Sequence, residues 1–122
     1  MTNPNQRNRE LRQALAEAAA DAAGEVAGVA RLRPDLAATL RGAGGFRELA
    51  RTQRALPAVR LTAVSGGRDR WEAGIELRIA LHRGHRAVDV CRAVRTAVSE
   101  AAGKVLPDGS RSTVTVIVTG IV

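Results

Sequence analysis

The stretch from Arg70 to Gly103 reads RWEAGIELRIALHRGHRAVDVCRAVRTAVSEAAG, and it decides the fold. Its first half alternates, with apolar side chains at Ile75, Leu77, Ile79 and Leu81 and mostly polar side chains between them. Successive side chains on a β-strand point to opposite faces. The alternation therefore predicts a long strand with one buried face and one wetter face.

The second half of the stretch changes period. Apolar residues recur at steps of three and four, at Val88, Cys91, Val94, Val98 and Ala101. This spacing places them on one side of an α-helix, which we expect over residues 85–102. Arg83-Gly84 forms the tight turn before the helix, and Gly103 is a typical helix-ending residue.

Length and composition limit what the chain can be. Its 122 residues are typical of one domain, and 45% of them are hydrophobic, but only 2% are aromatic. The core must therefore consist of Val, Leu, Ile and Ala, which favours a thin, two-layer fold. The net charge is +7, and Lys104 is the only lysine among 19 basic residues. Arginine suits phosphate and carboxylate recognition, but codon bias is the simpler explanation of the excess.

The remaining segments supply partners for the strand and the helix. We predict a disordered tail over residues 1–7 and a single domain over residues 8–122, with a variable insert at residues 36–56. The predicted elements are a helix over 8–23 with Leu11, Leu15, Ala18 and Ala22 inward, and strands over 25–33, 58–64 and 112–121. In the strand over 58–64 we expect Val59, Leu61 and Ala63 on one face. Together they predict an α+β domain: a mostly antiparallel sheet of three or four strands, with the long helix and the N-terminal helix on one face.

Three pieces of the chain carry a resemblance to a known family. They are the Ala-rich helix running into Glu25–Leu32, the strand over 75–81 with Gly84 and Val88-Asp89-Val90, and Gly103 with the terminal strand that closes in Gly120-Ile121. In order and spacing the chain resembles the alkaline shock protein family, the envelope stress response proteins of Gram-positive bacteria.

This resemblance implies a non-enzymatic protein without a cofactor. It implies a cytoplasmic protein that self-associates, is held at the membrane by a membrane-anchored relative, and supports cell-envelope homeostasis. No tract of the sequence has the length of a membrane span, so we expect membrane contact through that partner and no direct insertion. The single Cys91 excludes an intramolecular disulfide and fits a reducing compartment.

The second face of the sheet is the expected self-association surface. Its candidate residues are Arg78, Thr115, Ile117 and Thr119, of which Ile117 is a large β-branched residue in a row of threonines. The last strand also contains no proline and no charge between Ser112 and Val122. If this strand lies at the edge of the sheet, nothing in its sequence protects that edge from pairing with a neighbour.

The alternative is a small basic nucleic-acid-binding protein of the KH type. Gly42-Ala43-Gly44-Gly45 matches the GxxG loop with which KH domains clamp a nucleic-acid backbone. Arg41 precedes the loop, and Arg47, Arg51 and Arg54 follow it on one predicted helical face. These four arginines are the candidate anion-binding residues, and a solvated arginine face is the simpler interpretation.

Three further positions have simple structural interpretations. His82, His85 and Asp89 have a spacing that suits a metal on one helix, but the strand-to-helix turn separates the two histidines, so we expect no metal site. Cys91 is predicted to be a buried helical cysteine rather than a nucleophile. Trp71 is predicted to cover one end of the core.

Overall fold

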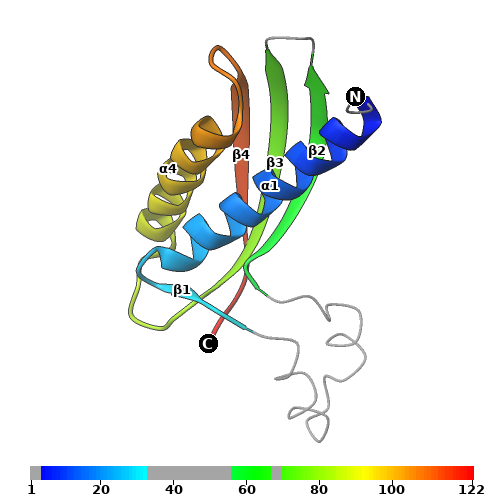
Figure 1. The fold of residues 1–122 in the computed structure, drawn as a ribbon. Helices are drawn as coiled ribbons and strands as arrows, with labels where there is room; N and C mark the ends of the chain where they lie inside the picture. Colours follow the sequence, from blue (N-terminus) through cyan, green and yellow to red (C-terminus); the bar gives the residue numbers. More distant parts are fainter. Residues whose placement is uncertain (1–3, 33–55, 67–69) are drawn as a thin grey trace, which may run out of the picture.

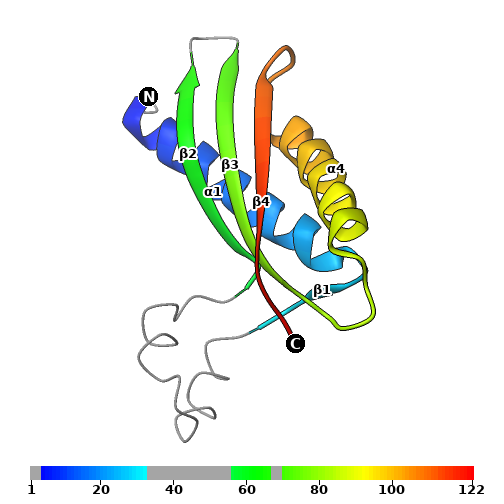
Figure 2. The ribbon, with the colours of Figure 1, turned by 180° about the vertical axis from the view of Figure 1, so that it is seen from behind.

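The computed structural model describes residues 4–32, 56–66 and 70–122. These described residues form two helices and four strands, in the order α1 (Pro4–Glu25), β1 (Val29–Ala30), β2 (Ala58–Gly66), β3 (Trp71–Leu81), α4 (Ala87–Val105) and β4 (Arg111–Ile121). Both helices cover one face of the sheet, and the other face carries no helix in the described part of the chain (Figures 1 and 2). The predicted two-layer α+β class is confirmed.

β3 is the central strand of the sheet. β2 pairs with it antiparallel over most of its length, and β1 pairs antiparallel with its last two residues, Ala80 and Leu81. β4 pairs with its other side, in parallel. The sheet is therefore mostly antiparallel, as predicted, with one parallel pair. A parallel neighbour requires a crossover of a dozen or more residues, which α4 provides between β3 and β4.

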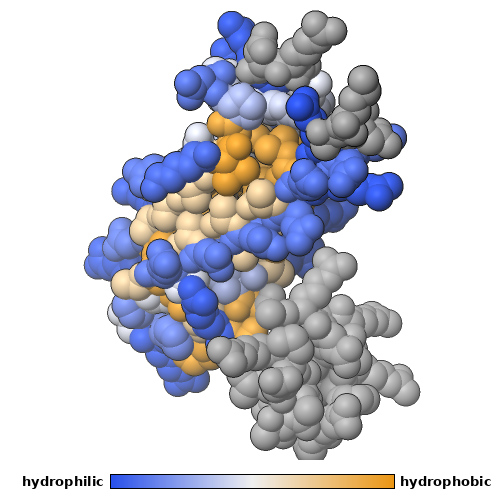
Figure 3. Space-filling model, viewed as in Figure 1, coloured by the Kyte–Doolittle hydropathy of each residue, from blue (hydrophilic) through white to orange (hydrophobic). Residues whose placement is uncertain are grey.

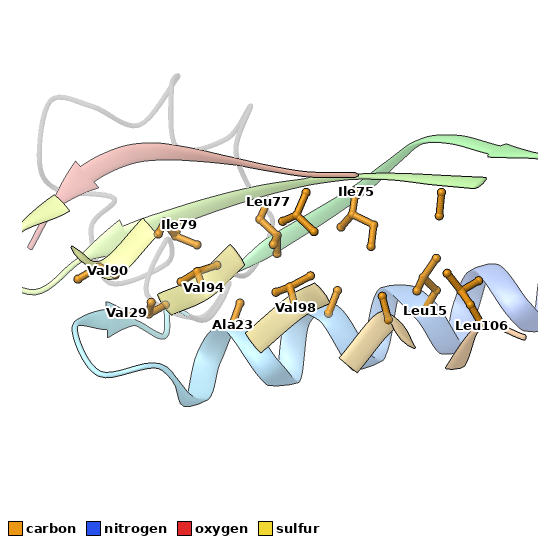
Figure 4. Packing of buried hydrophobic residues seen from close by; sticks show 14 of the residues in the cluster. Leu15, Ala23, Val29, Ile75, Leu77, Ile79, Val90, Val94, Val98 and Leu106 are labelled. Carbon is orange, nitrogen blue, oxygen red and sulfur yellow. The ribbon is translucent and has the colours of Figure 1, made fainter. Parts of the chain in front are cut away.

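The core lies between the sheet and the two helices (Figure 4). The predicted inward residues of β3 are confirmed, because Ile75, Leu77, Ile79 and Leu81 are all at most 1% exposed. They meet two rows of helical side chains spaced four residues apart, which are Leu15, Ala19 and Ala23 on α1 and Val90, Val94, Val98 and Ala102 on α4. Trp71 is half-buried and packs against this cluster, so its predicted position over one end of the core is also confirmed.

The inward stripe of α4 was predicted correctly at Val94 and Val98, which are fully buried, but not at its other positions. Val88 is 62% exposed, while Val90, which the prediction missed, is buried. Cys91 and Ala101 are only half-buried. The segment contains valine on more than one side of the helix, so packing against β3 and not hydrophobicity alone selects the row that turns inward. The same shift occurs on α1, where Ala19 and Ala23 are buried and Ala18 is half-buried.

The boundaries of both helices also differ from the prediction. α1 begins at Pro4, so residues 4–7 are helical and do not form a disordered tail. Gln6 Nε2 donates to Glu10 Oε1 over 3.5 Å, a contact one turn apart that supports this first turn. α4 continues through Gly103 to Val105, where the Leu106 N–H donates to the Ala102 carbonyl. Gly103 therefore lies inside the helix and does not end it.

The strands are corrected at two places. The predicted strand over 25–33 shortens to Val29–Ala30, because α1 extends to Glu25 and Gly28 turns the chain with a φ of +93°. In β2, the register shifts between Leu61 and Ala63, so Thr62 is an extra residue. Beyond this bulge the alternation reverses, which leaves Ala63 exposed and turns Val64 partly inward.

Candidate functional site: the open face of the sheet

The side of the sheet away from the helices, here called the open face, is built from the residues that alternate with the core positions. Those of β3 lie in the middle, flanked in register by residues of β2 and β4. The open face includes Ala58, Arg60, Thr62, Ala63 and Ser65 on β2, Glu72, Gly74, Glu76 and Arg78 on β3, and Arg111, Thr113, Thr115 and Ile117 on β4.

The structure brings three of the four predicted self-association residues together on this face. Ile117 lies directly beside Arg78 in the parallel ladder, and Thr115 lies beside Glu76. The Arg78 side chain is 52% exposed, and Ile117 remains 37% exposed. All three side chains are therefore accessible to a partner.

Thr119, the fourth predicted residue, has a local structural role. The register of β3 and β4 shifts after Ile79, which leaves Thr119 as the extra residue of a bulge. Its hydroxyl donates to the Ile79 carbonyl over 3.1 Å. This bond satisfies a backbone acceptor where the ladder is interrupted. Thr119 therefore stabilises the bulge and is removed from the candidate surface.

The open face carries charges of both signs, with Arg111 of β4 in register beside Glu72 and Arg60 of β2 in register beside Glu76. On β3, the acidic Glu72 lies near the beginning of the strand and the basic Arg78 lies towards its end. Arg78 Nε lies 3.5 Å from Glu76 Oε1. A partly exposed pair of this kind contributes about 0–1 kcal/mol, and the Arg78 side chain remains 52% exposed and accessible to a partner. Glu72 has no ion pair within the described part of the chain.

Gly74 lies in the middle of the face and is covered by Thr62. A Cβ atom at this glycine would collide with the Thr62 hydroxyl, because the bulge in β2 directs that side chain over the central strand. The sequence prediction missed both Gly74 and Glu72. Extending the two-residue alternation of β3 back from Glu76 would have placed them on this face.

β4 is an edge strand, since its described pairing is with β3 alone. In both ribbon views α4 lies on the outer side of β4 (Figures 1 and 2). The helix therefore flanks the edge, and the bulge at Thr119 distorts its far half. Helices and bulges are two of the ways in which proteins protect edges. The open face is thus more accessible to a partner than this edge.

The helix layer presents a different surface. Small apolar side chains run between the more polar flanks of this layer (Figure 3). They include the half-buried Ala18, Ala22, Ala97 and Ala101. No described feature of this alanine surface indicates what would cover it.

The three residues whose spacing was weighed for a metal, His82, His85 and Asp89, do not line one common hollow. His85 lies against Gly28 and, with Asp89, lines an open hollow of about 370 Å³ beside the first turn of α4, whereas His82 does not line it. Within residues 4–32, 56–66 and 70–122, no group of three His, Cys, Asp or Glu side chains has the arrangement of a metal site.

The KH-like candidate residues Arg41, Arg47, Arg51 and Arg54 lie outside the described residues, as does the GxxG loop. Of the predicted insert over 36–56, only Leu56 is described, and it forms an isolated bridge with Leu32. None of the described helices combines the length and the apolar character needed to cross a membrane.

Comparison with protein-family models, with curated proteins and with solved structures gives no match.

Proposed function

We propose that this protein is a non-catalytic scaffold of the cell-envelope stress response that acts by self-association. It works in the cytoplasm and reaches the membrane by binding a membrane-anchored relative. The observation that carries the proposal is the open face, which offers an accessible surface of mixed charge with Ile117 beside Arg78.

The arrangement of the elements supports the same proposal. The three pieces that resemble the alkaline shock protein family are far apart in the sequence, yet they belong to one packed unit. α1 and β1 meet the end of β3, α4 packs over the core, and β4 extends the sheet beside β3. The resemblance thus concerns residues that depend on one another for the fold.

Sedimentation velocity of the purified protein over rising concentrations tests self-association. We expect the sedimentation coefficient to increase with concentration. A protein that remains monomeric up to millimolar concentration would contradict the proposal.

Fractionation of native cells tests the proposed recruitment to the membrane. We expect the protein in the membrane fraction when the membrane-anchored partner is present, and in the soluble fraction when that partner is removed. A protein found only in the soluble fraction in both cases would argue against membrane recruitment.

Nucleic-acid binding tests the KH-like alternative. Titration of the protein into labelled nucleic acid at several salt concentrations would show tight binding and a steep salt dependence if the arginines contact phosphates. Loss of that binding in a variant with Arg47, Arg51 and Arg54 changed to Gln would favour the alternative over the scaffold.

A further inference from the structure

The open face has the charge pattern of a surface that can pair with itself. Its central strand carries Glu72 near one end and Glu76 and Arg78 towards the other, and Arg111 of β4 lies beside Glu72. We infer that two copies of this chain stack their open faces antiparallel, which places Glu72 of each copy against Arg78 of the other. This inference rests on the proposed function, and it names the surface and the geometry of self-association.

A two-fold axis running across the strands produces this arrangement. It reverses the strand direction of one copy and keeps each strand over its own counterpart. The axis lies midway between Gly74 and Glu76. Glu72 and its register neighbours on β2 and β4 then lie over Arg78 and its register neighbours in the second copy. Such an interface is isologous, so each contact occurs twice.

The opposite orientation brings like charges together. An axis parallel to β3 would place Glu72 over Glu72 of the second copy, and Arg78 over Arg78. Juxtaposed like charges disfavour an interface, whereas the antiparallel stack pairs unlike charges. The charges of β3 therefore favour the antiparallel stack, while Arg60 and Arg111 on the flanking strands lie directly opposite no charged residue in either orientation.

The remaining positions fit the antiparallel stack. Glu76 lies over Gly74 of the second copy, where no side chain projects from β3, and near the Thr62 hydroxyl that covers this glycine. Thr113 lies over Thr115, and Arg111 over Ile117, where the aliphatic part of the arginine can cover the apolar side chain. No like-charged residues of β3 face each other.

The size of the face predicts a weak complex. Three strands at a spacing of about 4.8 Å, with four rows of outward residues, cover roughly 400 Å² per copy. Stable interfaces bury about 800 Å² on each partner. We therefore expect association at high micromolar concentration or above, and we expect it to weaken as salt screens the charges.

Charge reversal tests the geometry. Glu72→Arg and Arg78→Glu should each raise the dissociation constant of self-association roughly tenfold. Each variant turns the two exposed Glu72–Arg78 contacts between the copies from attractive into repulsive. The double variant should recover the association of the wild-type protein, because the same pairs form again with their charges exchanged. Glu100→Arg, on the exposed side of α4, is the matched control and should have no effect.

Sedimentation equilibrium at low and high salt gives the dissociation constants, and circular dichroism checks that each variant is folded. If Arg78→Glu unfolds the protein, then Arg78→Gln, which removes the charge without adding a like charge beside Glu76, takes its place and should also weaken association. A wild-type protein that self-associates equally well in folded Glu72 and Arg78 variants overturns this inference and leaves the scaffold proposal intact. A wild-type protein that never associates overturns both.

Discussion

Gly74 is a position where the neighbouring strand leaves no room for a side chain. It lies on the central strand, and the Thr62 hydroxyl occupies the space that a Cβ atom would need. Threonine is stiff at χ1, so moving the hydroxyl away requires a less favoured rotamer. The bulge in β2 and the glycine in β3 therefore depend on each other.

Gly74→Ala should destabilise the protein by about 1–3 kcal/mol, because the added methyl group forces a shift in the neighbouring strand. Thermal or urea unfolding measures the loss. The double variant Gly74→Ala, Thr62→Ala should recover much of it, since the obstructing hydroxyl is gone. Gly120→Ala is the control, because open space surrounds Gly120. An equal loss in Gly74→Ala with and without Thr62 would contradict the proposed contact.

The buried row of α4 is also specified residue by residue. Ile79→Ala should cost about 2–5 kcal/mol, because Ile79 is fully buried and leaves a cavity at the interface of strand and helix. Val94→Ala should cost less, because valine is smaller. Val88→Ala should remain within about 0.5 kcal/mol, since Val88 is exposed. If chemical denaturation ranks Val88→Ala with Val94→Ala, the inward row of α4 has been assigned wrongly.

At the scale of the elements, sequence alone predicted what periodicity encodes. The alternation of Ile75, Leu77 and Ile79 determined both the strand and its buried face. The helix over 85–102 was recognised as an element, but its inward row was predicted only in part, because valines at 88 and 90 offer two different inward rows. The choice between them depends on contact with β3, which a local sequence pattern does not reveal.

The directions of the strands and the positions of the bulges could not be predicted from a local sequence pattern. A two-residue alternation is the same in parallel and antiparallel strands, so it could not show that β4 runs parallel to β3. The bulges at Thr62 and Thr119 depend on the register between strands. Alternation correctly placed Arg78, Thr115 and Ile117 on the open face, whereas the bulge gave Thr119 a local structural role.

Gly103 provides a test at the scale of a helix. It lies exposed inside α4, no atom lies within 4 Å of the position that a Cβ would take, and its backbone is not left-handed. Gly103→Ala should therefore stabilise the protein by about 0.5–1 kcal/mol. Gly84→Ala should destabilise it by about 1–2 kcal/mol, because Gly84 has a φ of +92°. Opposite shifts in the melting temperature are expected, and a loss of stability in Gly103→Ala would place the end of the helix at Gly103.

At the scale of the whole molecule, the two layers offer different surfaces for assembly. The helix layer presents small alanine side chains, whereas the open face combines Ile117 with ordered charges. Most of the exposed large hydrophobic residues lie on or just after β4, and Val88 on α4 is the other. A pair of matched substitutions can therefore decide which layer is used.

Ile117→Lys and Val88→Lys each replace an exposed, β-branched side chain with a lysine and add one positive charge. Ile117 lies on the open face beside Arg78, so its replacement should add a like charge to the interface and abolish self-association. Val88 lies in the helix layer, so its replacement should leave the oligomer distribution unchanged. Sedimentation velocity reads out both variants, and circular dichroism confirms their fold. If Val88→Lys dissociates the oligomer while Ile117→Lys does not, assembly uses the helix layer, and the open face loses its assigned role.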